Sequence, residues 1–267
     1  MEGNKLLFVG EKIIPFLPES PMSLYGKNTL KYISENGMEV RALLPKFGNI
    51  NERRNQLHEV IRLSGLNIIV DDIDHPLLIK VASLPGTRIQ VYFIDNDDLF
   101  KKRPLFNDTE GKEFEDNYER AVFYARSTME TCKLLHWNPS IIQCQGWFST
   151  LVPFFLKKAY QDDPNFAQSK VILTLYNESL ENPLPKNFAK MLCFKDITTD
   201  SIKESGMSLN TFEDYIKFSV LFADGIICGD KDINPNILSL AKEKNIPILE
   251  YQAEEFEAKT LDFYKSL

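Results

Sequence analysis

The sequence predicts one α/β domain of the Rossmann-like type, in which helices cover both faces of a doubly wound, mostly parallel sheet. Two observations support this fold class. Short, continuous apolar runs recur along the 267 residues, and amphipathic segments of helical length separate most of them. Unbroken apolar runs are typical of parallel strands, and repeated β–α–β order implies a parallel sheet. Because the sequence has no repeat, low-complexity stretch or linker, residues 1–267 are expected to form a single domain.

The first part of the chain predicts two parallel strands, one helix and an inserted set of strands. Residues 6–9 and 40–44 are the parallel strands, each stopped by a glycine or a proline. Residues 24–36 form the helix between them, which ends at an Asn-Gly pair. β-Branched runs separated by turn residues then predict an inserted, partly antiparallel set of strands at 60–61, 66–70, 77–81 and 89–94.

The rest of the chain alternates helices and strands. Apolar residues at three- and four-residue spacing predict a long helix over 118–135. Thr211 and Asp214 form a capping-box pattern that starts another helix. Pro153 marks the first turn or a kink of a further helix, whereas residues 178–210 are polar and irregular. The remaining predicted strands are 141–142, 171–173, 225–227 and 247–249, and the remaining helices are 236–244 and 256–264.

Composition and charge exclude several classes of protein. Hydrophobic residues make up 43% and charged residues 26%, as in ordinary soluble domains, and a net charge of −7 argues against a nucleic-acid partner. The apolar run at 6–10 is too short for a signal peptide or a membrane span, so we expect a cytoplasmic protein with no membrane partner. We expect no cofactor and no metal site. The cysteines lack a C-x-x-C pair and are expected to be reduced core residues: Cys132, Cys144, Cys193 and Cys228.

Ligands of doubly wound sheets bind outside the carboxyl ends of the strands. We therefore expect binding side chains in the loops that follow the predicted strands. Four loops are expected to line this edge: 10–23, 45–56, 145–149 and 176–187.

Six segments carry motifs that agree with one known family. They read E-x-x-x-P-F (11–16), Y-F-I-D-N-D-D-L-F (92–100), D-N-Y-E-R-A (116–121), I-Q-C-Q-G-W (142–147), T-L-Y-N (174–177) and F-A-D-G-I-I (222–227). In this order, over about residues 5–230, the chain resembles the bacterial glycogen/starch synthases, glycosyltransferase family 5. The resemblance implies the N-terminal lobe alone of a two-lobe glycosyltransferase fold, in a family that transfers glucose from ADP-glucose to an α-1,4-glucan.

The loop after the first strand departs from the family. The family's K-T-G-G-L loop offers a lysine and glycine amides to the diphosphate of the sugar nucleotide. Residues 18–22 read P-E-S-P-M, so that Glu19 stands in place of the lysine and Ser20 follows it. A carboxylate there would repel a diphosphate, and proline removes a donor. The second lobe is also expected to be missing, because only a short helix–strand–helix segment follows residue 230.

Two further motifs depart at the residues that the family uses in its site. The histidine and aspartate of the family's H-D-W fall on Gln145 and Gly146, before Trp147. The histidine of its T-I-H-N falls on Tyr176, before Asn177. A glutamine still hydrogen-bonds a sugar hydroxyl, but it cannot exchange a proton near neutral pH. We therefore assign no catalytic residue.

The candidate ligand-binding residues also have structural interpretations. The Gln-Gly-Trp segment at 145–147 is either a sugar contact or a plain strand-to-helix turn with a core tryptophan. The acidic run at 95–98 is more typical of a capped turn than of a metal or acceptor site. The D-N-x-x-R motif lines an acceptor cleft by family resemblance, or is a solvated helix start. The candidates are Glu19, Ser20, Asp95, Asn96, Asp116, Asn117, Arg120, Gln145, Gly146, Trp147, Tyr176 and Asn177.

The sequence leaves three hypotheses about function. The first is a glycogen/starch synthase-like protein of glycogen metabolism that lacks autonomous glucosyl transfer and is glucan-associated or regulatory. The alternative is an ADP-glucose:α-1,4-glucan glucosyltransferase that is active with a separate C-terminal lobe or another partner. The third is an interaction module without a sugar ligand. The expected partners are accordingly an α-glucan, and ADP-glucose or a second-lobe protein.

Overall fold

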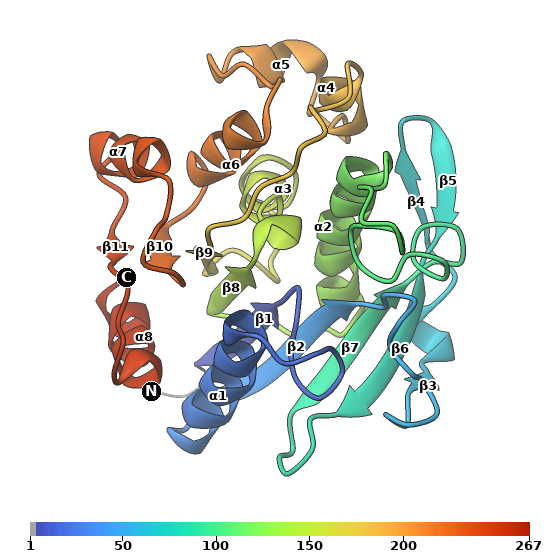
Figure 1. The fold of residues 1–267 in the computed structure, drawn as a ribbon, viewed down its shortest axis with the longest axis vertical. Helices are drawn as coiled ribbons and strands as arrows, with labels where there is room; N and C mark the ends of the chain where they lie inside the picture. The colour runs from blue at the N-terminus through green and yellow to red at the C-terminus, as the bar shows by residue number, and fades with distance from the viewer. Residues whose placement is uncertain (1–3) are drawn as a thin grey trace.

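A nine-stranded sheet forms the centre of the computed structural model, which describes residues 4–267 (Figure 1). In spatial order its strands are β11 (Ile248–Leu249), β10 (Gly225–Cys228), β9 (Lys170–Leu175), β8 (Ile141–Gln145), β1 (Lys5–Val9), β2 (Glu39–Pro45), β7 (Gln90–Asp95), β6 (Leu78–Ser83) and β3 (His58–Glu59). Neighbours from β11 to β7 pair in parallel, whereas β6 and β3 are antiparallel additions beyond β7. A separate hairpin is formed by β4 (Asn67–Val70) and β5 (Ile73–Pro76).

Helices cover both faces of this sheet. They are α1 (Pro21–Glu35), α2 (Asn117–Leu134), α3 (Val152–Ala159), α4 (Phe188–Met191), α5 (Thr199–Lys203), α6 (Phe212–Val220), α7 (Pro235–Glu243) and α8 (Phe256–Ser266), with the 3-10 turns η1 (Ile61–Leu63) and η2 (Trp147–Ser149). α1 packs against α8 on one face, while α2, α3 and α6 lie on the other (Figure 1). The sheet is therefore wound in both directions.

The topology reverses beside the first strand. β1 pairs on one side with β2, which the chain reaches next, and on the other with β8, which follows the inserted strands. Connections therefore leave the centre of the sheet in opposite directions. At such a switch point the loops after the two neighbouring strands diverge and leave a crevice at the carboxyl ends. The loops after β1 and β8 are thus the first place to look for a site.

Packing on both faces buries the middle of the sheet completely. Residues 6–9 of β1 are inaccessible to solvent, as a parallel strand between two helical layers must be. A buried polar network also ties α8 to the centre. The hydroxyl of Tyr264 donates to Gln143 Oε1, Gln143 Nε2 donates to the hydroxyl of Tyr25 over 3.1 Å, and that hydroxyl lies 3.0 Å from Thr260 Oγ1. These contacts join α8, α1 and β8.

The predicted fold class is confirmed: the sheet is mostly parallel, doubly wound and carries an inserted set of strands between β2 and β7. The predicted parallel strands and the long helix over 118–135 are confirmed within a few residues. None of the helices in the described part of the chain, residues 4–267, is long and apolar enough to cross a membrane. The cysteines are all unpaired as expected, although Cys193 is only partly buried.

Some predictions of local structure were wrong. Residues 60–61 are not a strand, because the chain leaves β3 at Glu59 and tightens into η1. The sequence did not predict β5. The chain returns from β4 to β5 through a turn in which Asp71 and Asp72 have φ values of 48° and 65°. Asparagine and glycine are more typical at such positions, so an Asp-Asp pair is a weaker sequence indication of a hairpin. Residues 178–210 are not irregular throughout, since α4 and α5 lie within them.

Candidate functional site

Three loops that are far apart in sequence meet at the carboxyl edge of β1, β8 and β9. The loop after β1 brings Glu11 and Lys12, the turn after β8 brings Gly146 and Trp147, and Glu178 comes from the segment after β9. Loops 10–23, 145–149 and 176–187 therefore supply the polar groups of this edge. Loop 45–56, the fourth that the sequence indicated, adjoins them through Phe47, whose ring lies 5.7 Å from that of Phe148. Its Glu52 bridges Lys46 and Lys80.

Gln145, at the end of β8, is completely buried. Its Nε2 donates to the backbone carbonyl of Met22 over 2.9 Å and to the hydroxyl of Tyr176 over 3.1 Å. Its Oε1 has no hydrogen-bond partner among residues 4–267. The amide thus closes the space between α1 and β9 instead of facing an open cleft. Desolvation raises the pKa of Tyr176 well above its usual range, so the pair is neutral and does not exchange protons near neutral pH.

Gly146 must be a glycine because Glu11 occupies the space beside it. Its φ is +81°, a conformation that side chains rarely adopt, and a Cβ there would lie 2.5 Å from Glu11 Oε2. Glu11 is completely buried, and its Oε2 accepts a hydrogen bond from the backbone N–H of Phe148 over 3.4 Å. A backbone N–H group of the turn after β8 is therefore already bound by a carboxylate of the protein, that of Glu11.

A second carboxyl group meets the same turn. Glu178 Oε2 accepts a hydrogen bond from the backbone N–H of Trp147 over 3.0 Å, so the carboxyl groups of Glu178 and Glu11 bind consecutive backbone N–H groups of the same turn. Lys12 Nζ lies 2.9 Å from Glu11 Oε1. Desolvation and the neighbouring Glu11 raise the pKa of Glu178 well above its usual range, although Lys12 opposes the shift. The pair thus holds a proton that a solvated glutamate would lose.

The N-terminus of α1 is capped by its own side chains. Ser20 Oγ accepts from the backbone N–H of Ser23 over 3.2 Å, and Ser23 Oγ accepts from that of Ser20 over 2.8 Å. Pro21 begins the helix and has no N–H. Glu19 is exposed beside this cap. These groups leave the helix end poorly suited to phosphate, which requires free N–H donors and positive charge.

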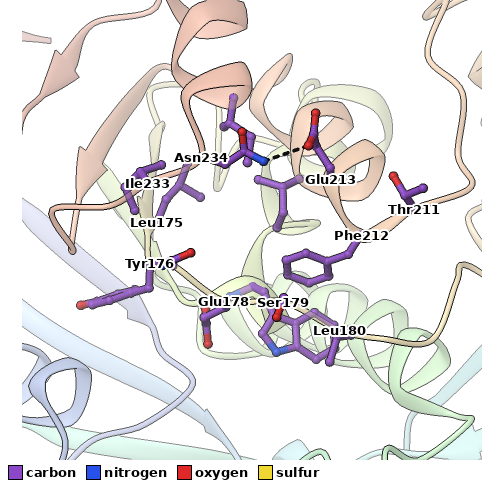
Figure 2. A pocket seen from close by; sticks show the side chains of 14 residues that line it. Leu175, Tyr176, Glu178, Ser179, Leu180, Thr211, Phe212, Glu213, Ile233 and Asn234 are labelled. Carbon is purple, nitrogen blue, oxygen red and sulfur yellow. Dashed lines mark hydrogen bonds between the residues drawn. The ribbon is translucent and has the colours of Figure 1, made fainter.

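A cavity of about 330 Å³ opens beyond Trp147, between the segment after β9 and the starts of α6 and α7 (Figure 2). Phe212 presents its ring to this space, and Glu213 accepts a hydrogen bond from Asn234 Nδ2 over 2.9 Å. A hydrogen bond from Lys217 holds the pKa of Glu213 below its usual value. The lining residues are Trp147, Leu175, Tyr176, Asn177, Glu178, Ser179, Leu180, Thr211, Phe212, Glu213, Ile216, Ile233, Asn234 and Ile237.

A second cavity of about 320 Å³ lies on the other side of residues 178–180. It shares Trp147 and residues 178–180 with the first cavity, and Phe106 and Glu113 add to its wall. Phe106 and Trp147 pack edge to face at 4.9 Å between ring centroids. One short segment therefore separates two cavities that share an aromatic wall.

The D-N-x-x-R motif holds the backbone that carries Phe106. Asn117 Nδ2 donates to the carbonyl of Phe106 over 3.0 Å, and Arg120 Nη1 donates to Asn117 Oδ1 over 2.8 Å and to the carbonyl of Leu105 over 2.9 Å. Asp116 pairs with Arg103, 2.8 Å away. Asn117 and Arg120 are buried, so the motif is not a solvated helix start.

The acidic run after β7 lies apart from the two cavities. Asp95 pairs with Lys80 over 2.8 Å, and Asn96 Oδ1 accepts from the backbone N–H groups of Asp98 and Leu99 over 3.0 Å each. This is the geometry of a capped turn. Of the sequence candidates, Trp147, Tyr176 and Asn177 line the first cavity. Gln145 and Gly146 precede Trp147 but line neither cavity, and Gln145 is bonded to Tyr176.

Sequence reasoning missed several residues of this site. Glu11 belongs to the E-x-x-x-P-F motif but is not among the predicted binding residues, and Glu178 directly follows the T-L-Y-N motif. Phe212, Glu213 and Asn234 come from α6 and from the start of α7, outside the four expected loops. Only the predicted capping box at 211–214 pointed to that region.

Comparisons with known proteins point to one family. A family model described as the starch synthase catalytic domain matches residues 5–245. The glycogen synthase of Chlorobium luteolum is 35% identical over 190 residues, which are 70% of this chain and 39% of that protein. The glycogen synthase of Chlorobaculum parvum is 31% identical over 219 residues, or 81% of this chain and 44% of that one. The chain thus spans about two fifths of the length of these curated relatives.

A solved structure shows the same fold. The catalytic domain of starch synthase IV from Arabidopsis thaliana, bound to ADP and acarbose, superposes with a TM-score of 0.68 at 16% identity, over 99% of this chain and 50% of that chain. The match is confined to a single lobe, as the sequence resemblance implied. Together with the family match over residues 5–245, this leads to one conclusion: the chain belongs to the starch synthase catalytic-domain family and corresponds to its N-terminal lobe.

Proposed function

We propose that this chain is a protein of glycogen metabolism that associates with glucan or regulates its synthesis, and that it does not transfer glucose by itself. The observation that carries the proposal is that the protein's own side chains occupy the space at the carboxyl ends of β1, β8 and β9. Gln145 is buried under Met22 and Tyr176, and two carboxyl groups, Glu11 and Glu178, take the backbone donors after β8. We further propose a cytoplasmic location, in keeping with four unpaired cysteines.

The chemistry of the transfer supports this proposal. Retaining glucosyl transfer depends on positioning and on electrostatic stabilisation of the leaving diphosphate. At this edge the cation nearest the turn after β8, Lys12, is engaged by Glu11, and the N-terminus of α1 is closed by Ser20 and Pro21. A diphosphate placed there would face Glu19 and the carboxyl pair.

The cavity beside Phe212 suits a neutral saccharide. Sugars pack their apolar faces on aromatic rings and exchange hydrogen bonds with amides, carboxylates and hydroxyls. Phe212 and Trp147 offer the rings, and Asn177 and Asn234 offer amides. Among the described residues that line this cavity there is no lysine, arginine or histidine, so it offers no positive charge to a phosphate. This favours a glucan over a sugar nucleotide.

Glucosyl transfer is tested by mixing the purified chain with ADP-glucose and glycogen and following the elongation of the glucan. We expect no elongation above the enzyme-free rate, with an active glycogen synthase as the positive control. Turnover by this chain alone would contradict the loss of autonomous transfer.

Glucan association is tested by sedimenting the protein with glycogen. We expect the wild type to bind and Phe212→Ala to bind about tenfold more weakly, equivalent to about 1.4 kcal/mol. The control is Phe222→Ala, a partly buried aromatic residue that packs on Phe154 and Phe218 outside the cavity. Failure of the wild type to bind would instead favour an interaction module without a sugar ligand.

The second candidate is ADP-glucose:α-1,4-glucan glucosyltransferase activity in combination with a C-terminal lobe. It is supported by the match to only 39% of the Chlorobium luteolum glycogen synthase. Calorimetry with ADP and ADP-glucose, in the presence of a C-terminal lobe from such a relative, separates the two candidates. Tight nucleotide binding to the mixture, but not to either component, favours the second.

A further inference from the structure

Residues 178–182 form a segment that is held down at both ends. At one end, Glu178 accepts the backbone N–H of Trp147 over 3.0 Å. At the other, Glu113 accepts the backbone N–H groups of Glu181 over 2.7 Å and Asn182 over 2.9 Å. Between these anchors, residues 178–180 separate the two cavities of about 330 and 320 Å³. Release of the Glu178 end would join them across Trp147.

At the Glu178 anchor, two carboxyl groups lie close together in a site from which water is largely excluded. The carboxyl group of Glu178 lies beside that of Glu11, because the two accept from consecutive backbone N–H groups, those of Trp147 and Phe148, and Glu11 is completely buried. Two ionised carboxylates in contact repel strongly where water is excluded. Lys12 can neutralise one of them, and it already lies 2.9 Å from Glu11. The contact therefore requires a proton on the pair.

Other charged or titratable groups surround this anchor from each neighbouring element. Lys12 and Glu11 come from the loop after β1, Tyr176 from the end of β9, and Glu213 from α6. Tyr215 of α6 donates to the carbonyl of Trp147 over 3.4 Å. Tyr118 of α2 donates to the carbonyl of Asn182 over 3.2 Å. Desolvation raises the pKa of the three tyrosines, so none supplies a charge near neutral pH, and Glu213 is held by Lys217.

We propose that Glu178 is a proton-dependent latch: while it is protonated it holds residues 178–182 over Trp147, and its ionisation beside Glu11 releases the segment and joins the two cavities into one groove. Because the pKa of Glu178 is raised in the closed form, closure is stabilised at lower pH and weakens as the pH rises through that raised value. The transition therefore falls above the usual range of glutamate. The latch operates without any ligand and does not depend on what the groove binds.

The experiment uses Trp147 as its own reporter. Trp137→Phe leaves Trp147 as the one tryptophan, because the sequence has two. Acrylamide quenching of its fluorescence is measured between pH 5 and 9, with circular dichroism to verify the fold. In this parent protein we expect the quenching constant to rise at least twofold with pH, since Trp147 is 3% exposed when the segment is closed.

Two matched variants decide the outcome. Glu178→Gln keeps a neutral hydrogen-bonding group, and Glu11→Gln removes the repulsion while Lys12 remains; both are expected to stay weakly quenched at every pH. Glu254→Gln, an exposed glutamate before α8, is expected to behave like the parent. A pH-independent parent, or a transition that persists in both the Glu178 and the Glu11 variants, would overturn the latch. No glucan is present, so this result is separate from that of glycogen binding.

Discussion

Gln145 and Tyr176 replace the two histidines that the family resemblance implies at these positions, and they bond to each other over 3.1 Å. A buried amide and a phenol of raised pKa form a neutral pair that fixes β8, β9 and the start of α1. At both positions the resemblance implies a histidine, which titrates near neutral pH, whereas this chain has a group that does not. These two side chains therefore connect neighbouring elements of the fold and do not face an open binding site.

The cost of a side chain at Gly146 can be measured against a glycine without neighbours. Gly146 and Gly37 have φ values of +81° and +93°, but a Cβ at Gly146 would lie 2.5 Å from Glu11 Oε2, and one at Gly37 would meet nothing within 4 Å. We expect Gly37→Ala to lose about 1 kcal/mol and Gly146→Ala about 3 kcal/mol or more in urea unfolding. Equal losses would mean that Glu11 moves aside freely.

Sequence reasoning located the residues of β8 and β9 that meet the site, but not the carboxyl pair. Gln145, Trp147 and Tyr176 follow apolar runs, so the rule that ligands lie at the carboxyl ends of strands finds them. Glu11 and Glu178 meet at one turn although they come from loops that are distant in sequence. Glu11 begins the E-x-x-x-P-F motif and Glu178 follows T-L-Y-N, but neither motif indicates that the two side chains lie together. Only the three-dimensional packing gives that pair its raised affinity for a proton.

At the scale of elements, the N-terminus of α1 is capped by side chains of its own first turn. The capping box between Ser20 and Ser23 satisfies the donors that a phosphate would otherwise use. The helix also began three residues earlier than the apolar pattern indicated, because the cap and Pro21 set its start. Sequence periodicity finds the middle of such a helix more reliably than its end.

Ser20→Ala is expected to destabilise the protein by about 1 kcal/mol, since it leaves the N–H of Ser23 without its partner. The control is Asn28→Ala on the exposed face of the same helix, which should change stability by less than about 0.5 kcal/mol. Chemical denaturation of both variants checks the difference. If the two losses were alike, the cap would contribute nothing beyond helix propensity.

The inserted strands show where element prediction failed. β-Branched runs at 66–70 and 77–81 were visible, but β5 between them contains Asp74, His75 and Pro76 and lacks an apolar alternation. Its register comes from pairing with β4, in which Ile68 lies opposite His75. Short α4 and α5 were equally invisible, because helices of four or five residues carry too little periodicity.

At the scale of the whole molecule, α8 binds the last part of the chain to its centre. The network of Tyr264, Gln143 and Tyr25 lies between α8, β8 and α1, and Gly225 at the start of β10 packs under Phe263. The tail after residue 230, which the sequence marked only as a helix–strand–helix segment, is therefore part of the same core. Residues 1–267 as one domain stays a prediction.

That prediction has a direct test. Residues of β1, β10 and α8 belong to one continuous cluster of buried side chains, so we expect a single cooperative transition. Thermal or urea unfolding followed by tryptophan fluorescence, which reports on residues 137 and 147, should coincide with unfolding followed by far-ultraviolet circular dichroism. Two separate midpoints would divide the chain into more than one unit.

The central position of β1 has a consequence for the protein during its synthesis. Lys5 donates its backbone N–H to Ser140, 135 residues later in the chain, where β8 begins. A ribosome working at 5–20 residues per second needs roughly 7 to 30 seconds to cover that distance. Throughout this interval, the apolar strand at 6–9 lacks its partner β8, so one of its edges is unpaired. Until β8 has been synthesised, β1 therefore lacks one of its two neighbours in the sheet.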